Sequence, residues 1–140
     1  MKLKKQLQYL MAVVFALMLV TPAMAQLKSP PQQKNGVYNM VDDQPSFPGG
    51  NKNLFKYLAQ NVKYPKADLE SNVQGRAMIQ FVVEKDGSLT EVKVVRAPTS
   101  AMGEEAKRVF KNSPKWKPGK VNGKAVRTMY TMPVNFTLGA

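Results

Sequence analysis

The stretch that most constrains this fold lies between Gly75 and Pro98 and reads GRAMIQFVVEKDGSLTEVKVVRAP. It contains two runs in which apolar and polar residues alternate, joined by an Asp86-Gly87 pair. A period of two is typical of strands with one buried face, and Asp-Gly supplies the left-handed backbone that a tight hairpin turn requires. We therefore expect a β-hairpin. The core face of its first strand should consist of Ala77, Ile79, Phe81 and Val83.

Two helices and a further long strand are expected around this hairpin. An apolar stripe at helical spacing predicts a first helix over Asn51–Asn61, with Asn51 as its N-cap. Pro65 follows Tyr64 and ends this helix, and it can itself open a short helical turn. A second stripe predicts a helix over residues 102–112. The last strand is expected over residues 126–138, where Pro133 marks an edge strand or a bulge.

This order of elements predicts an α+β, two-layer domain in which two helices pack on a three-stranded antiparallel sheet. Residues 37–41 could add a short strand. Trp116, the single tryptophan, is interpreted as a core aromatic that closes the sheet against the second helix. Tyr64 is interpreted in the same way, with its hydroxyl seeking a hydrogen-bond partner.

The composition argues against catalysis. The chain has no histidine and no cysteine, which removes the commonest general base, two common zinc ligands and every thiol mechanism. The nine carboxylates are scattered, and we interpret them as solvated charges. We therefore predict no catalytic residue, no metal site and no cofactor, and the protein is not expected to be an enzyme.

The amino terminus has the three-part pattern of a secretory signal peptide. A basic start precedes an apolar run over residues 7–20, and Ala23-Met24-Ala25 offers a cleavage site. We assign residues 1–25 to the signal peptide, 26–36 to a flexible polar leader and 37–140 to the domain. Cleavage would give a periplasmic protein. The alternative, which the sequence leaves open, is an uncleaved leader that anchors the chain in the inner membrane.

Several segments, taken together and in order, resemble the carboxy-terminal domain of the TonB family of energy transducers. They are QPSFPGG before the first helix, NVKYPKAD, QGRAMIQFVVEKDGSLTEVKVVR, EEAKRVFKNSPKWKPGK and the terminal PVNFTL. The FPGG segment looks most like versions from Bacteroidetes-type bacteria. The landmarks of the resemblance are single residues within these segments, namely Tyr64, Pro65, Gly75, Asp86, Gly87, Trp116, Pro118 and Gly119.

The resemblance implies a periplasmic domain that binds TonB-dependent outer-membrane transporters. In the family, an extended receptor segment called the TonB box pairs with the last strand of the domain, which is β-strand addition. Carried onto this chain, the pairing is expected around Arg127, Met129 and Thr131. The full set of expected partner-binding residues is Val126, Arg127, Thr128, Met129, Tyr130, Thr131 and Val134.

Other partners follow from the alternatives. An anchored chain would act as a full energy transducer and engage an inner-membrane proton-driven motor. A cell-envelope structural module would bind anionic wall polymer through the basic group between Lys111 and Lys124. An exposed last strand also allows a homodimer. Nucleic acid is not an expected partner of an exported protein.

Overall fold

The structure is a computed structural model that describes residues 33–139 of the 140-residue chain. The expected signal peptide and most of the expected polar leader lie outside the described residues. The helices are α2 (Asn51–Asn61), α3 (Lys66–Glu70) and α4 (Ser100–Lys111). The strands are β1 (Gln33–Lys34), β2 (Val37–Tyr38), β3 (Gly75–Val83), β4 (Leu89–Arg96), β5 (Gly119–Val121), β6 (Lys124–Val126) and β7 (Thr128–Phe136).

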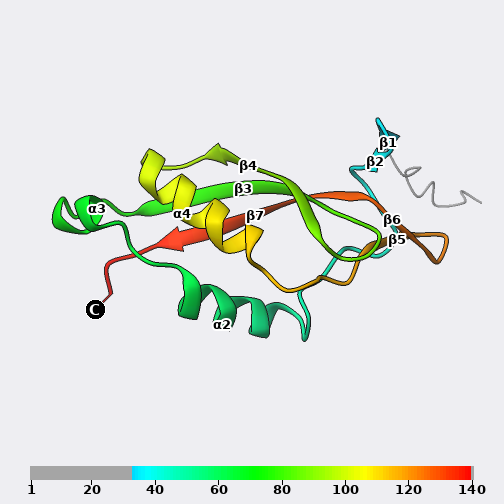
Figure 1. The fold of residues 1–140 in the computed structure, drawn as a ribbon, viewed down its shortest axis with the longest axis horizontal. Coiled ribbons are helices and arrows are strands. Elements are labelled where there is room, and N and C mark those ends of the chain that lie inside the picture. The colour runs from blue at the N-terminus through cyan, green and yellow to red at the C-terminus, as the bar shows by residue number, and fades with distance from the viewer. Residues whose placement is uncertain (1–32, 140) are drawn as a thin grey trace, which may run out of the picture. The chain divides into compact units, whose positions relative to one another are not determined.

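The main sheet is mixed and has the strand order β1-β2-β7-β3-β4. Its centre is β3, which pairs antiparallel with β4 on one side and with β7 on the other. β2 joins β7 in parallel at a single pair, Tyr38↔Thr128. The helix α4 packs against β3 and β4, and α2 lies alongside β7 (Figure 1). The predicted α+β fold is confirmed, and the three long strands are antiparallel as predicted. The short strands β1 and β2 were not counted in the prediction of a three-stranded sheet, and β2 makes the sheet mixed.

The predicted final strand over residues 126–138 is wrong at both ends. Asn122 and Gly123 adopt φ angles of 52° and 74°, and this turn folds Lys124–Val126 back onto Gly119–Val121 as the separate β5–β6 hairpin. The long strand therefore begins at Thr128 and ends at Phe136.

Both longer helices form where the apolar stripes predicted them, but the N-cap of α2 and the start of α4 differ from the prediction. The bounds of α2 are as predicted, whereas its N-cap is Gly50 with φ 86° and no side-chain cap, so Asn51 is already helical. Glycine adopts this left-handed conformation easily. The helix α4 starts at Ser100, two residues earlier than predicted, because the Thr99 hydroxyl accepts a hydrogen bond from the Met102 backbone amide at 3.1 Å.

The core lies between the sheet and the helices. The predicted core face of β3 is confirmed, because Ala77, Ile79, Phe81 and Val83 are all fully buried. Trp116 is confirmed as a core aromatic: it is 4% exposed and its ring lies 5.3 Å from Phe81 in a tilted, edge-on contact. Tyr57 ties the two longer helices together, since its hydroxyl donates to the Val109 carbonyl at 2.8 Å.

Candidate functional site: the outer edge of β7

The outer edge of β7 is largely unpaired. On its inner side, β7 pairs with β3 from Gly75↔Phe136 to Val83↔Thr128 without a register shift. On its outer side, β2 reaches it only at Thr128. Within residues 33–139, no strand pairs with the outer side of β7 beyond that point (Figure 1). An edge of this kind presents a row of backbone N–H and C=O groups to a further strand.

Pro133 shows which backbone groups face outward. It pairs with Met78 inside the uninterrupted β3–β7 register. Proline has no N–H, so it fits only at a position whose backbone groups point away from β3. These groups alternate along a strand, so Thr131 and Asn135 point outward as well. The Tyr38 amide donates to the Arg127 carbonyl at 2.8 Å. The Arg127 carbonyl therefore also points outward, as the alternation from Pro133 predicts.

The side chains of β7 alternate between the core and the opposite face of the sheet. Thr128, Val134 and Phe136 are buried among the core residues. Tyr130 is half-buried, and its ring centroid lies 6.2 Å from those of both Phe81 and Trp116. Thr131 and Asn135 are exposed. A partner strand would therefore meet mainly backbone groups on this edge, with exposed side chains on the face of the sheet opposite the core.

The expected partner-binding residues fall into two groups. Val126 lies in β6 opposite Gly119, Arg127 is paired with Glu84, and Thr128 is 1% exposed. The structure brings Met129, Tyr130, Thr131 and Val134 onto the part of β7 beyond its bridge to β2. Asn135 was not among the residues expected from the sequence, although the alternation starting from Pro133 would have included it.

An ion pair fixes the start of β7 to the central hairpin. The Arg127 guanidinium donates to both carboxylate oxygens of Glu84, at 2.8 and 3.0 Å. Thr90 adds a hydroxyl hydrogen bond of 2.5 Å to the same carboxylate. The bond from Arg127 lowers the pKa of Glu84, and Glu84 in turn raises the pKa of Arg127. This ion pair thus holds the residue immediately before β7 in place.

An apolar groove runs between α2 and the end of β7. Phe55, Ala59 and Val62 line it from the helix, and residues 133–137 line it from the strand. Its volume is about 340 Å³. Tyr64 also lines this groove, and its ring meets Phe136 edge-on with centroids 5.7 Å apart. Phe55 belongs to the apolar stripe that predicted this helix, and a helical period does not show where the neighbouring sheet ends.

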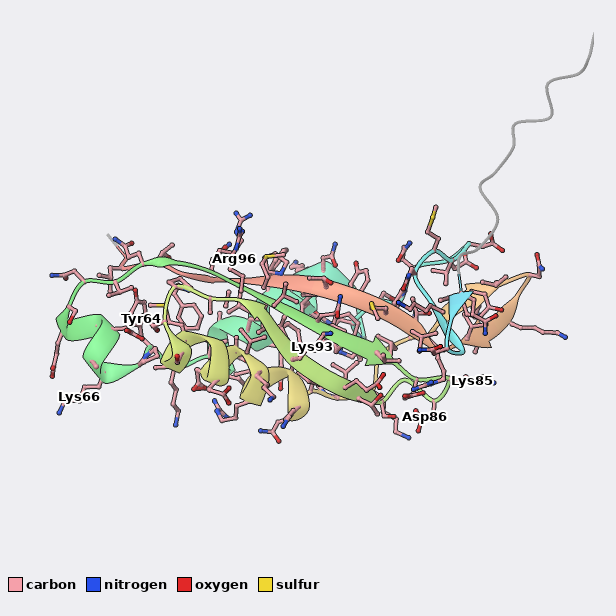
Figure 2. The ribbon with its side chains drawn as sticks, turned by 90° about the horizontal axis from the view of Figure 1, so that it is seen from above. Tyr64, Lys66, Lys85, Asp86, Lys93 and Arg96 are labelled. Carbon is pink, nitrogen blue, oxygen red and sulfur yellow. The ribbon has the colours of Figure 1, made fainter. Side chains whose placement is uncertain are left out.

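Tyr64 is held by its own hydrogen bond. Its hydroxyl donates to the Val73 carbonyl, as expected for a half-buried tyrosine. Burial raises the pKa of the phenol, and the nearby Asp68 carboxylate adds to the rise. Figure 2 shows Tyr64 near α3 and Asp86 at the far end of the β3–β4 hairpin. Pro65 is the N-cap residue of α3.

The glycine landmarks are positions of close approach. A Cβ on Gly87 would lie 2.0 Å from the Trp116 carbonyl oxygen, and a Cβ on Gly119 would lie 2.2 Å from the Thr128 hydroxyl. A Cβ on Gly75 would lie 2.5 Å from Cγ of Pro98. Pro118 immediately precedes β5. These residues shape the framework around β7.

Among residues 33–139, no three carboxylates, histidines or cysteines gather in a way that could hold a metal ion. No helix in the same range is long and apolar enough to cross a membrane.

Comparison with known proteins assigns the family. The model of the carboxy-terminal part of the Gram-negative bacterial TonB protein matches residues 60–138, which is more than half of the chain. The chain belongs to the TonB C-terminal family. This TonB domain is therefore non-catalytic and faces the periplasm, and its family implies interaction with TonB-dependent outer-membrane transporters. The match does not place it in a bacterial subgroup.

Solved TonB domains are also similar to this one. The Helicobacter pylori TonB C-terminal domain, residues 179–285, is 20% identical with a TM-score of 0.49, over 66% of this chain and 88% of that one. The Pseudomonas aeruginosa TonB C-terminal domain is 21% identical with a TM-score of 0.46, over 56% of this chain and 80% of that one. No curated protein matches the chain.

Proposed function

We propose that this domain binds the TonB box of an outer-membrane TonB-dependent transporter as an added strand on β7, and so supports energised nutrient uptake. The observation that carries the proposal is the outward-facing backbone of Thr131, Pro133 and Asn135, which no strand of the described residues covers. Each backbone hydrogen bond contributes about 0.5–1.5 kcal/mol net. Only a few are available here, so the complex should be weak and should release its partner readily.

The opposite edge of the sheet is less suited to strand addition. The β3–β4 pairing contains two register shifts, and Glu91 in β4 has a φ angle of 50°. Bulges and exposed charges are devices that discourage further pairing. Figure 2 shows the charged residues Lys93 and Arg96 on β4. We therefore expect the partner on β7 and not on β4.

The test is a titration of synthetic peptides, taken from the amino-terminal segments of TonB-dependent transporters, into the purified protein. The backbone amides of Thr131 and Asn135 should shift in NMR spectra while those of β4 stay in place. Unchanged β7 amides at saturating peptide would contradict strand addition.

A substitution at Thr131 separates backbone from side-chain recognition. Thr131→Pro removes one outward N–H and leaves the ladder to β3, so binding should weaken by about 1 kcal/mol, or roughly fivefold in Kd. Thr131→Val is the matched control, because it removes the hydroxyl and keeps the N–H. If the two variants bound the peptide equally well, hydrogen bonding to this backbone position would not be involved.

We further propose that the protein is exported and that residues 1–25 are removed. The apolar run over residues 7–20 is bounded by Pro22 and a small-residue cleavage site, which favours cleavage. The mass of the native protein tests this. A chain that begins at Gln26 supports the free periplasmic domain, and a chain that retains Met1 supports an anchored transducer coupled to a proton-driven motor.

A further inference from the structure

Two hydrogen bonds tie the helix α2 to α4. The Tyr57 hydroxyl donates to the Val109 carbonyl of α4 at 2.8 Å, and the Arg108 guanidinium of α4 donates to the Asn61 carbonyl at 2.9 Å. The helix α2 runs beside β7, and the two elements line one groove (Figure 1). The groove between them is therefore bordered by the unpaired backbone of β7 on one side and by a helix on the other.

The helix leaves a large apolar side chain uncovered in this groove. Phe55 is 64% exposed, the highest value among the exposed large hydrophobic residues of the described part. Leu54, its neighbour in sequence, is 1% exposed, so the apolar stripe of α2 is wider than the core that covers it. Burial of an exposed phenylalanine side chain against apolar groups stabilises a complex. A partner that covered Phe55 would gain such stabilisation.

The geometry of a sheet specifies what would cover it. A strand added to β7 would lie about 4.8 Å beyond it, and its side chains would alternate between the two faces. Val134 and Phe136 point to the core side of β7 and line the groove. Alternate side chains of the added strand would point the same way, towards Phe55, Ala59 and Val62. The groove volume of about 340 Å³ is at the lower end of the usual ligand-pocket range of about 300–1,000 Å³.

Charge indicates a separate partner and not a second copy of this chain. The sequence of α2 contains two lysines, Lys52 and Lys56, and no acidic residue. The whole chain carries a formal charge of +12, and removal of residues 1–25, which contain Lys2, Lys4 and Lys5, would leave +9. A second copy of the chain would bring like charges towards the lysines of α2 beside this groove, whereas a neutral or acidic segment would not.

We propose that the α2–β7 groove is a side-chain pocket for the strand added to β7, and that Phe55 makes it selective for a large apolar residue of the transporter segment. This inference rests on the proposed strand addition and extends it: the β7 backbone supplies register and affinity, and the groove discriminates between segments. An extended segment with apolar residues at alternate positions is the occupant that satisfies both.

The experiment is a double-mutant cycle between protein and peptide. The probes are a synthetic peptide of about seven residues in which leucine and threonine alternate, and its counterpart in which each leucine is alanine. Phe55→Ala should weaken binding of the leucine peptide about fivefold to tenfold and should leave the alanine peptide nearly unchanged. Leu69→Ala is the matched control, because Leu69 is 48% exposed on α3, outside the residues that line the groove.

The outcomes separate the two proposals. If these two peptides and the transporter peptides all leave the Thr131 and Asn135 amides unshifted, strand addition fails and the pocket fails with it. If the leucine peptide shifts these amides but Phe55→Ala weakens both peptides equally, strand addition stands and the pocket is overturned. Because Phe55 is mostly exposed, Phe55→Ala should keep the thermal stability of the parent, which the same samples can show.

Discussion

Single residues fix the framework around the β7 edge through contacts that allow little substitution. Gly87 follows Asp86 in the hairpin turn, where the Asp86 carboxylate accepts hydrogen bonds from the Ser88 amide at 3.0 Å and the Ser88 hydroxyl at 2.6 Å. The Gly87 carbonyl accepts from the Trp116 amide at 2.8 Å. The turn and the segment that leads to β5 therefore approach each other backbone to backbone.

Gly87→Ala should be strongly destabilising. Gly87 has a φ angle of 88°, and a Cβ there would lie 2.0 Å from the Trp116 carbonyl oxygen. Gly123→Ala is a matched control, since φ is 74° and nothing lies within 4 Å. The control carries only the left-handed penalty of about 1–2 kcal/mol. Urea unfolding should show a larger loss for Gly87→Ala, and equal losses would refute the steric argument.

Glu84 should make stability depend on pH. Its pKa is lowered chiefly by the hydrogen bond from Arg127, so its contribution is present above its unfolded pKa of about 4.3 and is lost as pH falls through the lower folded value. Glu84→Gln should reduce the decrease in the free energy of unfolding with falling pH, measured by urea unfolding between pH 6 and roughly pH 3. Glu104→Gln, on the exposed side of α4, makes the same change in charge and should leave this pH dependence unchanged.

At the scale of elements, the sequence predicted the bounds of α2 and the core face of β3 because both depend on local periodicity. It did not predict that Val126 ends a separate hairpin, because the apolar alternation runs on from Val126 into β7 and does not show where one strand ends and the next begins. The start of α4 was missed for a similar reason. Thr99 caps this helix while bonded to Asp68, which is 31 residues away.

Thr99 links α3 to α4, and its loss should cost more than a surface cap. Its hydroxyl accepts from the Met102 amide at 3.1 Å and donates to the Asp68 carboxylate at 2.7 Å. Asp68 is 7% exposed, so Thr99→Ala removes the cap and takes a hydrogen-bond donor away from a buried carboxylate. We expect a loss of about 1–2 kcal/mol in thermal or urea unfolding. Thr99→Ser keeps the hydroxyl and should restore most of the stability; if it does not, the γ-methyl packing is responsible.

At the scale of the whole domain, one core holds the sheet and the helices together. Phe81 contacts both Phe110 of α4 and Trp116, with ring centroids 5.1 and 5.3 Å apart. The chain has no cysteine, so no disulfide supports this packing. Helix, sheet and the segment around Trp116 should therefore lose their structure together.

We expect a single cooperative unfolding transition. Trp116 fluorescence reports the core, and far-UV circular dichroism reports helix and sheet, so the two urea curves should coincide. Phe81→Ala should move both curves to lower urea by the same amount, with a cost of about 3–5 kcal/mol. Separate transitions for the two probes would show that the Trp116 segment opens independently of the sheet.

The sequence alone determined the hairpin, α2, the core face of β3 and the resemblance to a family, because each depends on residues close together in the chain. Only the tertiary structure decided which edge of the sheet stays open. That depends on Tyr38 meeting Thr128 across 90 positions of sequence, and on α2 standing beside β7 without a strand between them. Pairing between distant segments depends on the packing of the whole domain, and local periodicity does not predict it.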